Sequence, residues 1–127
     1  MIATISPMVD ELKAYAERNG PVTIGLAGCG QMGTDIVVQI ALMPGLRLGA
    51  VSEVNMKAAE DAATMAGYHP GDVVKADSAS AIDRAIEQGN LALTSDLTAL
   101  AAAGRIDVVI DATGNPNVGT LFALEAI

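Results

Sequence analysis

Short apolar runs rich in β-branched residues alternate with helix-forming stretches along most of the chain. The apolar runs predict strands at 22–27, 46–51, 91–94 and 106–110. Helices are predicted at 31–43, 56–67, 80–89 and 96–104. The evidence is the helical spacing of apolar residues, the alanine content, and Ser, Asp, Gly or Pro at the ends of these segments. Strands that alternate with helices pair in parallel through right-handed crossovers. The sequence therefore predicts an α/β protein with a Rossmann doubly wound parallel sheet.

The two ends of the chain lie outside this alternation. Residues 1–20 are predicted to be an N-terminal helical segment. Within it, Ser6-Pro7 is typical of a helix start and Asn19-Gly20-Pro21 of a helix end. Residues 21–127 form the predicted Rossmann domain. Its 68–77 segment, punctuated by Pro70-Gly71, is predicted to be a loop, and a further helix is predicted from Asn117 onward.

The chain ends after its fourth predicted strand, which indicates a Rossmann domain that is truncated there. We expect a substrate domain, which this chain does not contain, to lie beyond Ile127. An Ala-rich domain cut at this point is expected to expose an apolar sheet edge and helix flank. That exposure favours a homo-oligomer or marginal stability.

Composition excludes several classes of partner. The 127 residues carry seven Lys and Arg against fifteen Asp and Glu, a net charge of −8, which has the wrong sign for nucleic acid or anionic membranes. Aromatic residues make up only 2%, too few for a base-stacking platform. One Cys and one His offer neither a disulfide framework nor a zinc site, and a cytoplasmic location fits this usage. No signal peptide or membrane span is predicted.

The motif that carries chemistry is Gly28-Cys29-Gly30-Gln31-Met32-Gly33, a G-x-G-x-x-G pattern. It follows a predicted strand and opens a predicted helix, which is the context that a dinucleotide-binding loop requires. Gly28 permits the tight turn, Gly30 leaves room for the pyrophosphate, and Gly33 lets the helix lie close to the sheet. Backbone N–H groups near Gly30, Gln31 and Met32 are predicted to bind the phosphates.

A carboxylate follows at the distance that the dinucleotide fingerprint demands. Glu53 stands twenty residues beyond Gly33, at the end of the second predicted strand. There it is predicted to accept hydrogen bonds from the adenosine ribose hydroxyls, which favours NAD over NADP. The alternatives left open are a solvated carboxylate at Glu53 and an NADP site to which Ser52, Asn55 and Lys57 contribute.

The last predicted strand leads into Asp111-Ala112-Thr113-Gly114. Ligands of open α/β sheets bind at this carboxyl edge. The small residues Ala112, Thr113 and Gly114 are predicted to let the nicotinamide ribose pass over the backbone. A plain strand-to-helix loop is the alternative.

With these residues in place, the chain resembles the N-terminal NAD(P)-binding domain of homoserine-dehydrogenase-like oxidoreductases, especially the 1-deoxy-D-xylulose 5-phosphate reductoisomerase-like group. The likeness lies in residues 24–33, 44–46, 50–53 and 107–114, and it spans most of 21–127. The first and last of these motifs also resemble the glucose-fructose oxidoreductase family.

The resemblance implies a role for each part of the site. The residues that it assigns to the pyrophosphate are Gly28, Gly30, Gln31, Met32 and Gly33. It assigns Glu53 and its neighbours to the adenosine ribose and 112–114 to the nicotinamide side. The reductoisomerase-like group is associated with NADPH, whereas Glu53 departs from what a 2′-phosphate would favour. Catalytic residues of these families lie in a later domain, so none is assigned here.

The expected function is therefore to bind NAD or NADP as part of an oxidoreductase, for hydride transfer to or from a carbonyl substrate that another domain holds. One alternative is a regulatory module that binds NAD(H) without turnover. A nucleoside-binding, methyltransferase-like domain is disfavoured, because the acidic residue and three-glycine spacing fit a dinucleotide better.

Overall fold

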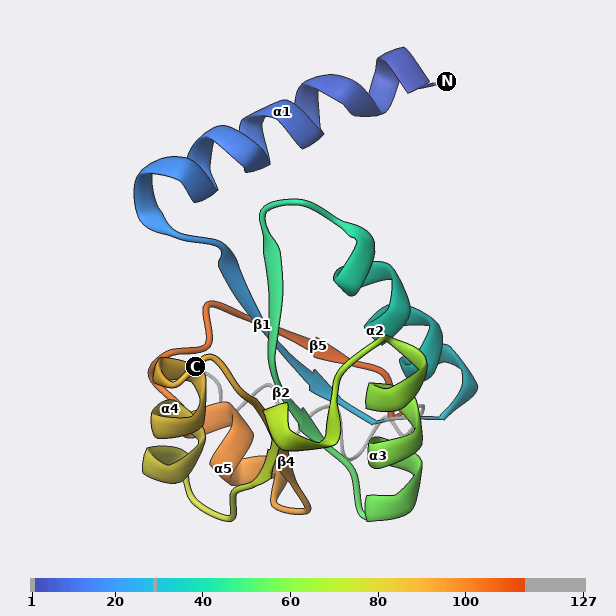
Figure 1. Ribbon diagram of the computed structural model, residues 1–127, viewed down its shortest axis with the longest axis vertical. Coiled ribbons are helices and arrows are strands. Elements are labelled where there is room, and N and C mark those ends of the chain that lie inside the picture. The colour runs from blue at the N-terminus through green and yellow to red at the C-terminus, as the bar shows by residue number, and fades with distance from the viewer. Residues whose placement is uncertain (1, 29, 114–127) are drawn as a thin grey trace.

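The computed structural model, which describes residues 2–28 and 30–113, has one parallel sheet with helices on both faces (Figure 1). Its strands are β1 (Val22–Ala27), β2 (Leu46–Ser52), β3 (Val73–Lys75), β4 (Leu91–Thr94) and β5 (Val108–Asp111). Its helices are α1 (Ile2–Asn19), α2 (Gln31–Leu42), α3 (Met56–Met65), α4 (Ala79–Glu87), α5 (Leu97–Ala102) and the short 3-10 turn η1 (Pro70–Asp72). The predicted doubly wound α/β fold is confirmed.

The strand order across the sheet is β3-β4-β2-β1-β5. From β1 the chain passes to β2 and then to β3 at the edge of the sheet, and β4 is inserted between β2 and β3. The chain then crosses the sheet to place β5 on the other side of β1. The direction of winding therefore reverses between β1 and β5. In open parallel sheets, the crevice at the carboxyl ends of two such strands is where ligands bind.

Two apolar cores, one on each face of the sheet, hold the helices in place. On one face, Val37 and Ile40 of α2 and the alanines of α3 pack against the larger sheet residues Leu26 and Leu48. On the other face, α4 and α5 pack over the small sheet residues Ala50 and Ala92. Alanines at the contact bring helix and sheet close together, which explains how a chain with so few aromatic residues fills its interior.

The strand β3 corrects the prediction of a loop over 68–77 and the count of four strands. Val74 and Lys75 pair with Ala92 and Leu93 of β4, at the edge of the sheet. Three residues are too short to show a strand period, so the strand forms because β4 offers it a partner. The final strand is consequently the fifth. It also begins two residues later than predicted, because the Asp107 carboxylate accepts a hydrogen bond from the Thr23 N–H (2.9 Å).

Two predicted helix starts are also wrong. Helix α4 is capped by Ser78, whose hydroxyl accepts a hydrogen bond from the Ala81 N–H (3.2 Å), and not by Ser80, at which the predicted helix over 80–89 begins. Helix α1 begins at Ile2, four residues before Ser6, because no glycine or proline interrupts that stretch. Pro7 has no N–H group, so one helical hydrogen bond is missing near the N-terminal end of α1. The helix predicted from Asn117 lies outside the described residues.

Candidate functional site

The carboxyl ends of four strands enclose a cavity of about 390 Å³. Its lining comes from the loops that follow β1, β2, β4 and β5. The lining residues are Gly28, Gly30, Ser52, Glu53, Val54, Ser95, Leu97, Ala112 and Thr113. The cavity thus lies at the point where the winding reverses, and its size is within the range typical of small-molecule sites. Among these lining residues, Glu53 alone carries a charge.

Backbone hydrogen bonds between neighbouring strand ends fix the floor of this cavity. The Gly28 N–H donates to the Ser52 carbonyl (2.8 Å), and the Ala112 N–H donates to the Ala27 carbonyl (2.8 Å). The Glu53 N–H donates to the Thr94 carbonyl (2.9 Å). Each loop therefore leaves the sheet from a position set by the parallel pairing.

The three glycines of the motif occupy three different environments. Gly28 has φ +95°, and a Cβ there would lie 2.8 Å from the Ala112 carbonyl oxygen, so the turn crosses directly beside the β5 loop. A Cβ on Gly33 would lie 2.3 Å from the Gly28 carbonyl oxygen, so α2 lies against the end of β1. A Cβ on Gly30 would meet nothing within 4 Å. The first and third glycines are needed for packing, whereas the second faces open space at the cavity.

Helix α2 begins at this open glycine. Its N-cap is Gly30, with φ −68° and ψ −166°, and Gln31 and Met32 form its first turn. In contrast, Asn55 and Asp96 use their side chains to cap the first turns of α3 and α5. A glycine N-cap has no side chain to satisfy the first N–H groups, which together with the helix dipole suits that end of α2 to an anion.

Glu53 lies at the predicted position, directly after β2, and it lines the cavity as a half-buried residue. One of its oxygens, Oε2, accepts a hydrogen bond from the Asn55 N–H (3.2 Å). This contact holds the carboxylate beside the start of α3. Lys57, the alternative partner for a 2′-phosphate, is 3.6 Å from Asp61 one turn along α3.

The loop after β5 faces the glycine loop. The Asp111 carboxylate accepts hydrogen bonds from the Thr113 N–H (2.9 Å) and the Thr113 hydroxyl (2.7 Å), which turns the chain back over the end of the strand. Ala112 and Thr113 thereby reach the cavity wall. The other predicted members of the motif loops, Cys29 and Gly114, lie outside the described residues.

Sequence reasoning did not assign Val54, Ser95 or Leu97 to the site, and it gave Ser52 only a secondary place. Ser52 ends β2 and Ser95 directly follows β4, whereas Val54 and Leu97 lie two and three residues beyond those strands. The carboxyl-edge rule applied to 91–94 would therefore have found Ser95 and the residues just after it. Val54 is 87% exposed, an unusual setting for a large apolar side chain, and it stands at the rim.

Asp96, predicted as a helix cap, serves that structural role beside the site. Its carboxylate accepts hydrogen bonds from the Thr98 hydroxyl and from the Thr98 (3.0 Å) and Ala99 (3.4 Å) N–H groups. The Thr98 hydroxyl, with help from these two backbone donors, holds the pKa of Asp96 below its ordinary value. The prediction that Ser95-Asp96 begins a helix is confirmed.

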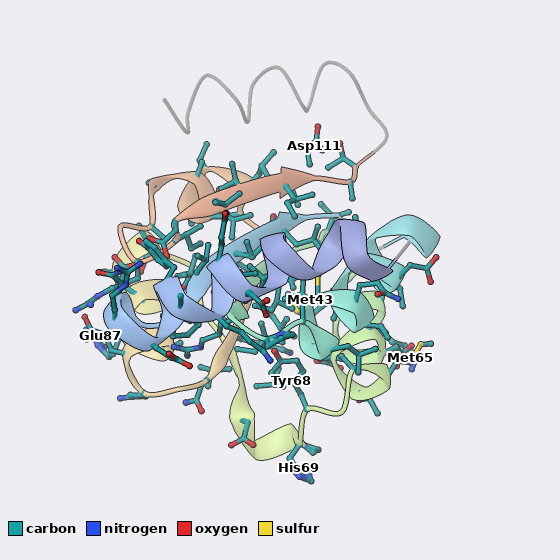
Figure 2. All side chains as sticks on the ribbon, turned by 90° about the horizontal axis from the view of Figure 1, so that it is seen from above. Met43, Met65, Tyr68, His69, Glu87 and Asp111 are labelled. Carbon is teal, nitrogen blue, oxygen red and sulfur yellow. The ribbon has the colours of Figure 1, made fainter. Side chains whose placement is uncertain are left out.

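A second cavity of about 400 Å³ lies between α3 and the β3 edge. It is lined by Glu60, Asp61, Thr64, Tyr68, Pro70, Val73, Lys75 and Leu93. Burial raises the pKa of Tyr68, and the Arg47 guanidinium partly opposes that rise. Figure 2 shows His69, beside this cavity, at the opposite side of the molecule from Asp111. No residue of the glycine motif lines this cavity.

The described part of the chain has neither a cluster of metal ligands nor a helix that could span a membrane. Within residues 2–28 and 30–113, no three His, Asp or Glu side chains gather in a way that could hold a metal ion. Over the same residues, no helix combines the length and the apolar character needed to cross a membrane.

Comparison with known proteins adds no family to these observations. No protein-family model matches the chain, and no curated protein matches its sequence.

Proposed function

We propose that this chain binds a nicotinamide dinucleotide, NAD or NADP, in the cavity between the β1 and β5 loops. The observation that carries the proposal is the difference among the three motif glycines. Gly28 and Gly33 are enclosed by backbone atoms, whereas Gly30, between them, borders open space in the cavity. A glycine kept where the protein itself leaves room for a side chain points to an external group that needs that room.

The residues around the cavity suit the parts of such a cofactor. The uncapped first turn of α2 would hold the pyrophosphate through backbone N–H groups. Glu53 would accept from the adenosine ribose hydroxyls, and the loop through Ala112 and Thr113 would border the nicotinamide side. When bound, the cofactor supplies hydride-transfer chemistry, and the chain belongs to an oxidoreductase whose substrate is held outside the described residues.

Charge at the ribose position favours NAD over NADP. Glu53 is the charged residue among those that line the cavity, and an additional 2′-phosphate would bring a charge of about −2 next to its carboxylate. Lys57, the nearest candidate for a compensating cation, already lies 3.6 Å from Asp61.

The test is calorimetric titration of NAD⁺, NADH, NADP⁺ and NADPH into the wild type and two valine variants. Gly30→Val places a side chain in the space proposed for the pyrophosphate. Gly71→Val is the matched control, because a Cβ on Gly71 also meets nothing within 4 Å but lies in η1, away from the cavity. We expect Gly30→Val to abolish binding and Gly71→Val to leave it unchanged, with both variants folded.

Three outcomes would contradict the proposal. Folded wild-type protein that binds none of the four cofactors at millimolar concentration would refute it outright. Equal affinity in Gly30→Val and wild type would mean that the open glycine serves only the turn. Equal losses in both valine variants would place the binding site elsewhere.

A further inference from the structure

Ser52 places a buried polar side chain at the floor of the cavity between the β1 and β5 loops. The residue ends β2, and in the parallel register it lies between Ala27 of β1 and Thr94 of β4. Its residue is only 6% exposed, yet it is one of those that line the cavity. Strands on both sides therefore hold Ser52 in the middle of the carboxyl edge of the sheet.

The Ser52 hydroxyl forms no hydrogen bond within the part of the chain that the structure describes. Hydroxyls nearby are satisfied by the protein: that of Thr94 accepts from the Asp96 N–H (3.0 Å), and that of Thr113 donates to Asp111 (2.7 Å). Among the same described residues, every fully enclosed side-chain oxygen or nitrogen has a hydrogen-bond partner. The Ser52 oxygen is therefore not fully enclosed, and the space that it reaches is the cavity.

An almost buried hydroxyl without a protein partner constrains what can fill the cavity. A ligand that displaces water from this hydroxyl and offers no polar atom in return leaves it unsatisfied, which costs binding free energy. A ligand that does offer a polar atom gains a hydrogen bond in a position shielded from water. Ser52 therefore favours a ligand with a polar group at the end of β2.

The neighbouring residue indicates which polar group this is. Glu53 follows Ser52 directly, and both line the cavity, which lies across the end of the sheet. An ionised carboxylate only accepts hydrogen bonds, whereas a serine hydroxyl also donates one. A sugar hydroxyl donates one hydrogen bond and accepts others, so a donor at Ser52 beside an acceptor at Glu53 matches it. A phosphate oxygen would suit Ser52 but not the carboxylate next to it.

We infer that Ser52 is a specificity-determining residue of the cofactor site: its hydroxyl donates a hydrogen bond to an adenosine ribose hydroxyl whose own proton is donated to Glu53. The pair selects ribose over deoxyribose, because loss of the contacted hydroxyl leaves both side chains without a ligand partner. The inference rests on the proposed function, which supplies the class of ligand.

The test is calorimetric titration of NADH, ADP, 2′-deoxy-ADP and 3′-deoxy-ADP into the wild type, Ser52→Ala and Thr23→Val. Thr23→Val is the control, because it removes another buried hydroxyl at the amino end of β1, outside the cavity. We expect Ser52→Ala to bind NADH and ADP about fivefold more weakly than the wild type, as for the loss of one hydrogen bond. It should bind the deoxy analogue that lacks the contacted hydroxyl as the wild type does. Thr23→Val should bind all four ligands unchanged.

Urea unfolding of the same proteins separates ligand contact from structural support. We expect Ser52→Ala to be as stable as the wild type, so a loss of stability that accompanies the loss of affinity would overturn the inference. If the wild type binds NADH and ADP, equal affinity in Ser52→Ala, or equal losses for ADP and both deoxy analogues, would overturn the inference alone. Wild-type protein that binds neither NADH nor ADP would overturn the proposed function and this inference with it.

Discussion

Alanine at Gly33 and alanine at Gly30 are the same chemical change three residues apart, yet we expect a clear loss of stability from the first and almost no change from the second. At Gly33 the new Cβ would lie 2.3 Å from the Gly28 carbonyl oxygen and 3.0 Å from the carbonyl carbon. Both atoms are backbone, so no side-chain rotation can relieve the contact. The start of α2 would have to move away from β1 by about 0.7 Å or more to reach the closest contacts that proteins tolerate.

The size of the effect follows from two opposing contributions. Replacing glycine by alanine inside a helix gains up to about 1 kcal/mol from helix propensity. Overpacking against a fixed neighbour costs typically ~1–3 kcal/mol, and the cost here lies toward the upper end because the neighbour is the backbone carbonyl of Gly28. We therefore expect Gly33→Ala to lower the free energy of unfolding by about 2 kcal/mol, which lowers Tm by roughly 8 °C.

For Gly30→Ala, the expected change in the free energy of unfolding is close to zero. Nothing lies within 4 Å of the new Cβ, and φ of −68° suits any residue. Alanine is a poorer N-cap than glycine, but it also restricts the unfolded chain, and these two effects offset one another to within about 0.5 kcal/mol. Urea unfolding followed by circular dichroism measures both variants. Gly33→Ala as stable as the wild type, or Gly30→Ala as unstable as Gly33→Ala, would refute the assignment of packing to one glycine and open space to the other.

Three further predictions concern single side chains. Glu53→Gln keeps an oxygen acceptor for the Asn55 N–H but removes the charge that would repel a 2′-phosphate, so we expect the NAD/NADP affinity ratio to fall about tenfold. Calorimetry at matched salt measures this ratio, and an unchanged ratio would mean that Glu53 does not face the ribose. The Thr98 hydroxyl donates a hydrogen bond to the Asp96 carboxylate and lowers its pKa in the folded protein, so the ionised carboxylate stabilises the fold above the unfolded-state pKa near 3.8, and this stabilisation is lost as pH falls below it. We therefore expect Asp96→Asn to lose less stability than the wild type below about pH 4 in acid unfolding. Stability curves against pH that run parallel for the two proteins would contradict this. The Asp83 carboxylate accepts hydrogen bonds from the backbone N–H groups of Gly104 (3.2 Å) and Arg105 (2.8 Å), so we expect Asp83→Ala to lower the free energy of unfolding by about 1–2 kcal/mol, measured with urea. An unchanged free energy would mean that water replaces both bonds.

The sequence predicted those features of the fold that local chemistry determines. Helix α3 ends as expected: Gly67 adopts φ +94° just beyond it, and the N–H of Tyr68 returns to the Ala63 carbonyl (3.0 Å). The cap at Asp96 and the stop before Pro44-Gly45 follow from equally local rules. In each case a single residue type has one favourable backbone role, so no knowledge of the tertiary structure is needed.

Features that depend on a distant partner were not predictable in the same way. The strand β3 exists because Val74 can pair with Ala92, and nothing within its three residues identifies it. Ser78 and Ser80 are both good N-caps, and Asp83, which would complete a capping box with Ser80, is instead engaged by the turn before β5. The choice between the two serines therefore depends on packing of α4 against that turn.

The candidate site likewise contains residues that the local sequence predicts and residues that depend on the strand order. The positions of Gly28, Gly30 and Glu53 follow from one strand, one turn and a fixed spacing, all within a single βαβ unit. Ser95 and Leu97 reach the same cavity only because β4 lies beside β2 in the sheet. Strand order determines which loops meet, and the linear sequence does not state that order.

The most direct test of the central claim is a titration of ¹⁵N-labelled protein with NADH, followed by the amide chemical shifts in NMR spectra. We expect saturable shifts at the amides around the β1–β5 crevice, above all Gly30, Glu53 and Thr113, with the second cavity around Tyr68 and Lys75 unaffected. Saturating NADH that moves no crevice amide, or that moves only amides of the second cavity, would contradict the claim that this crevice is a dinucleotide site.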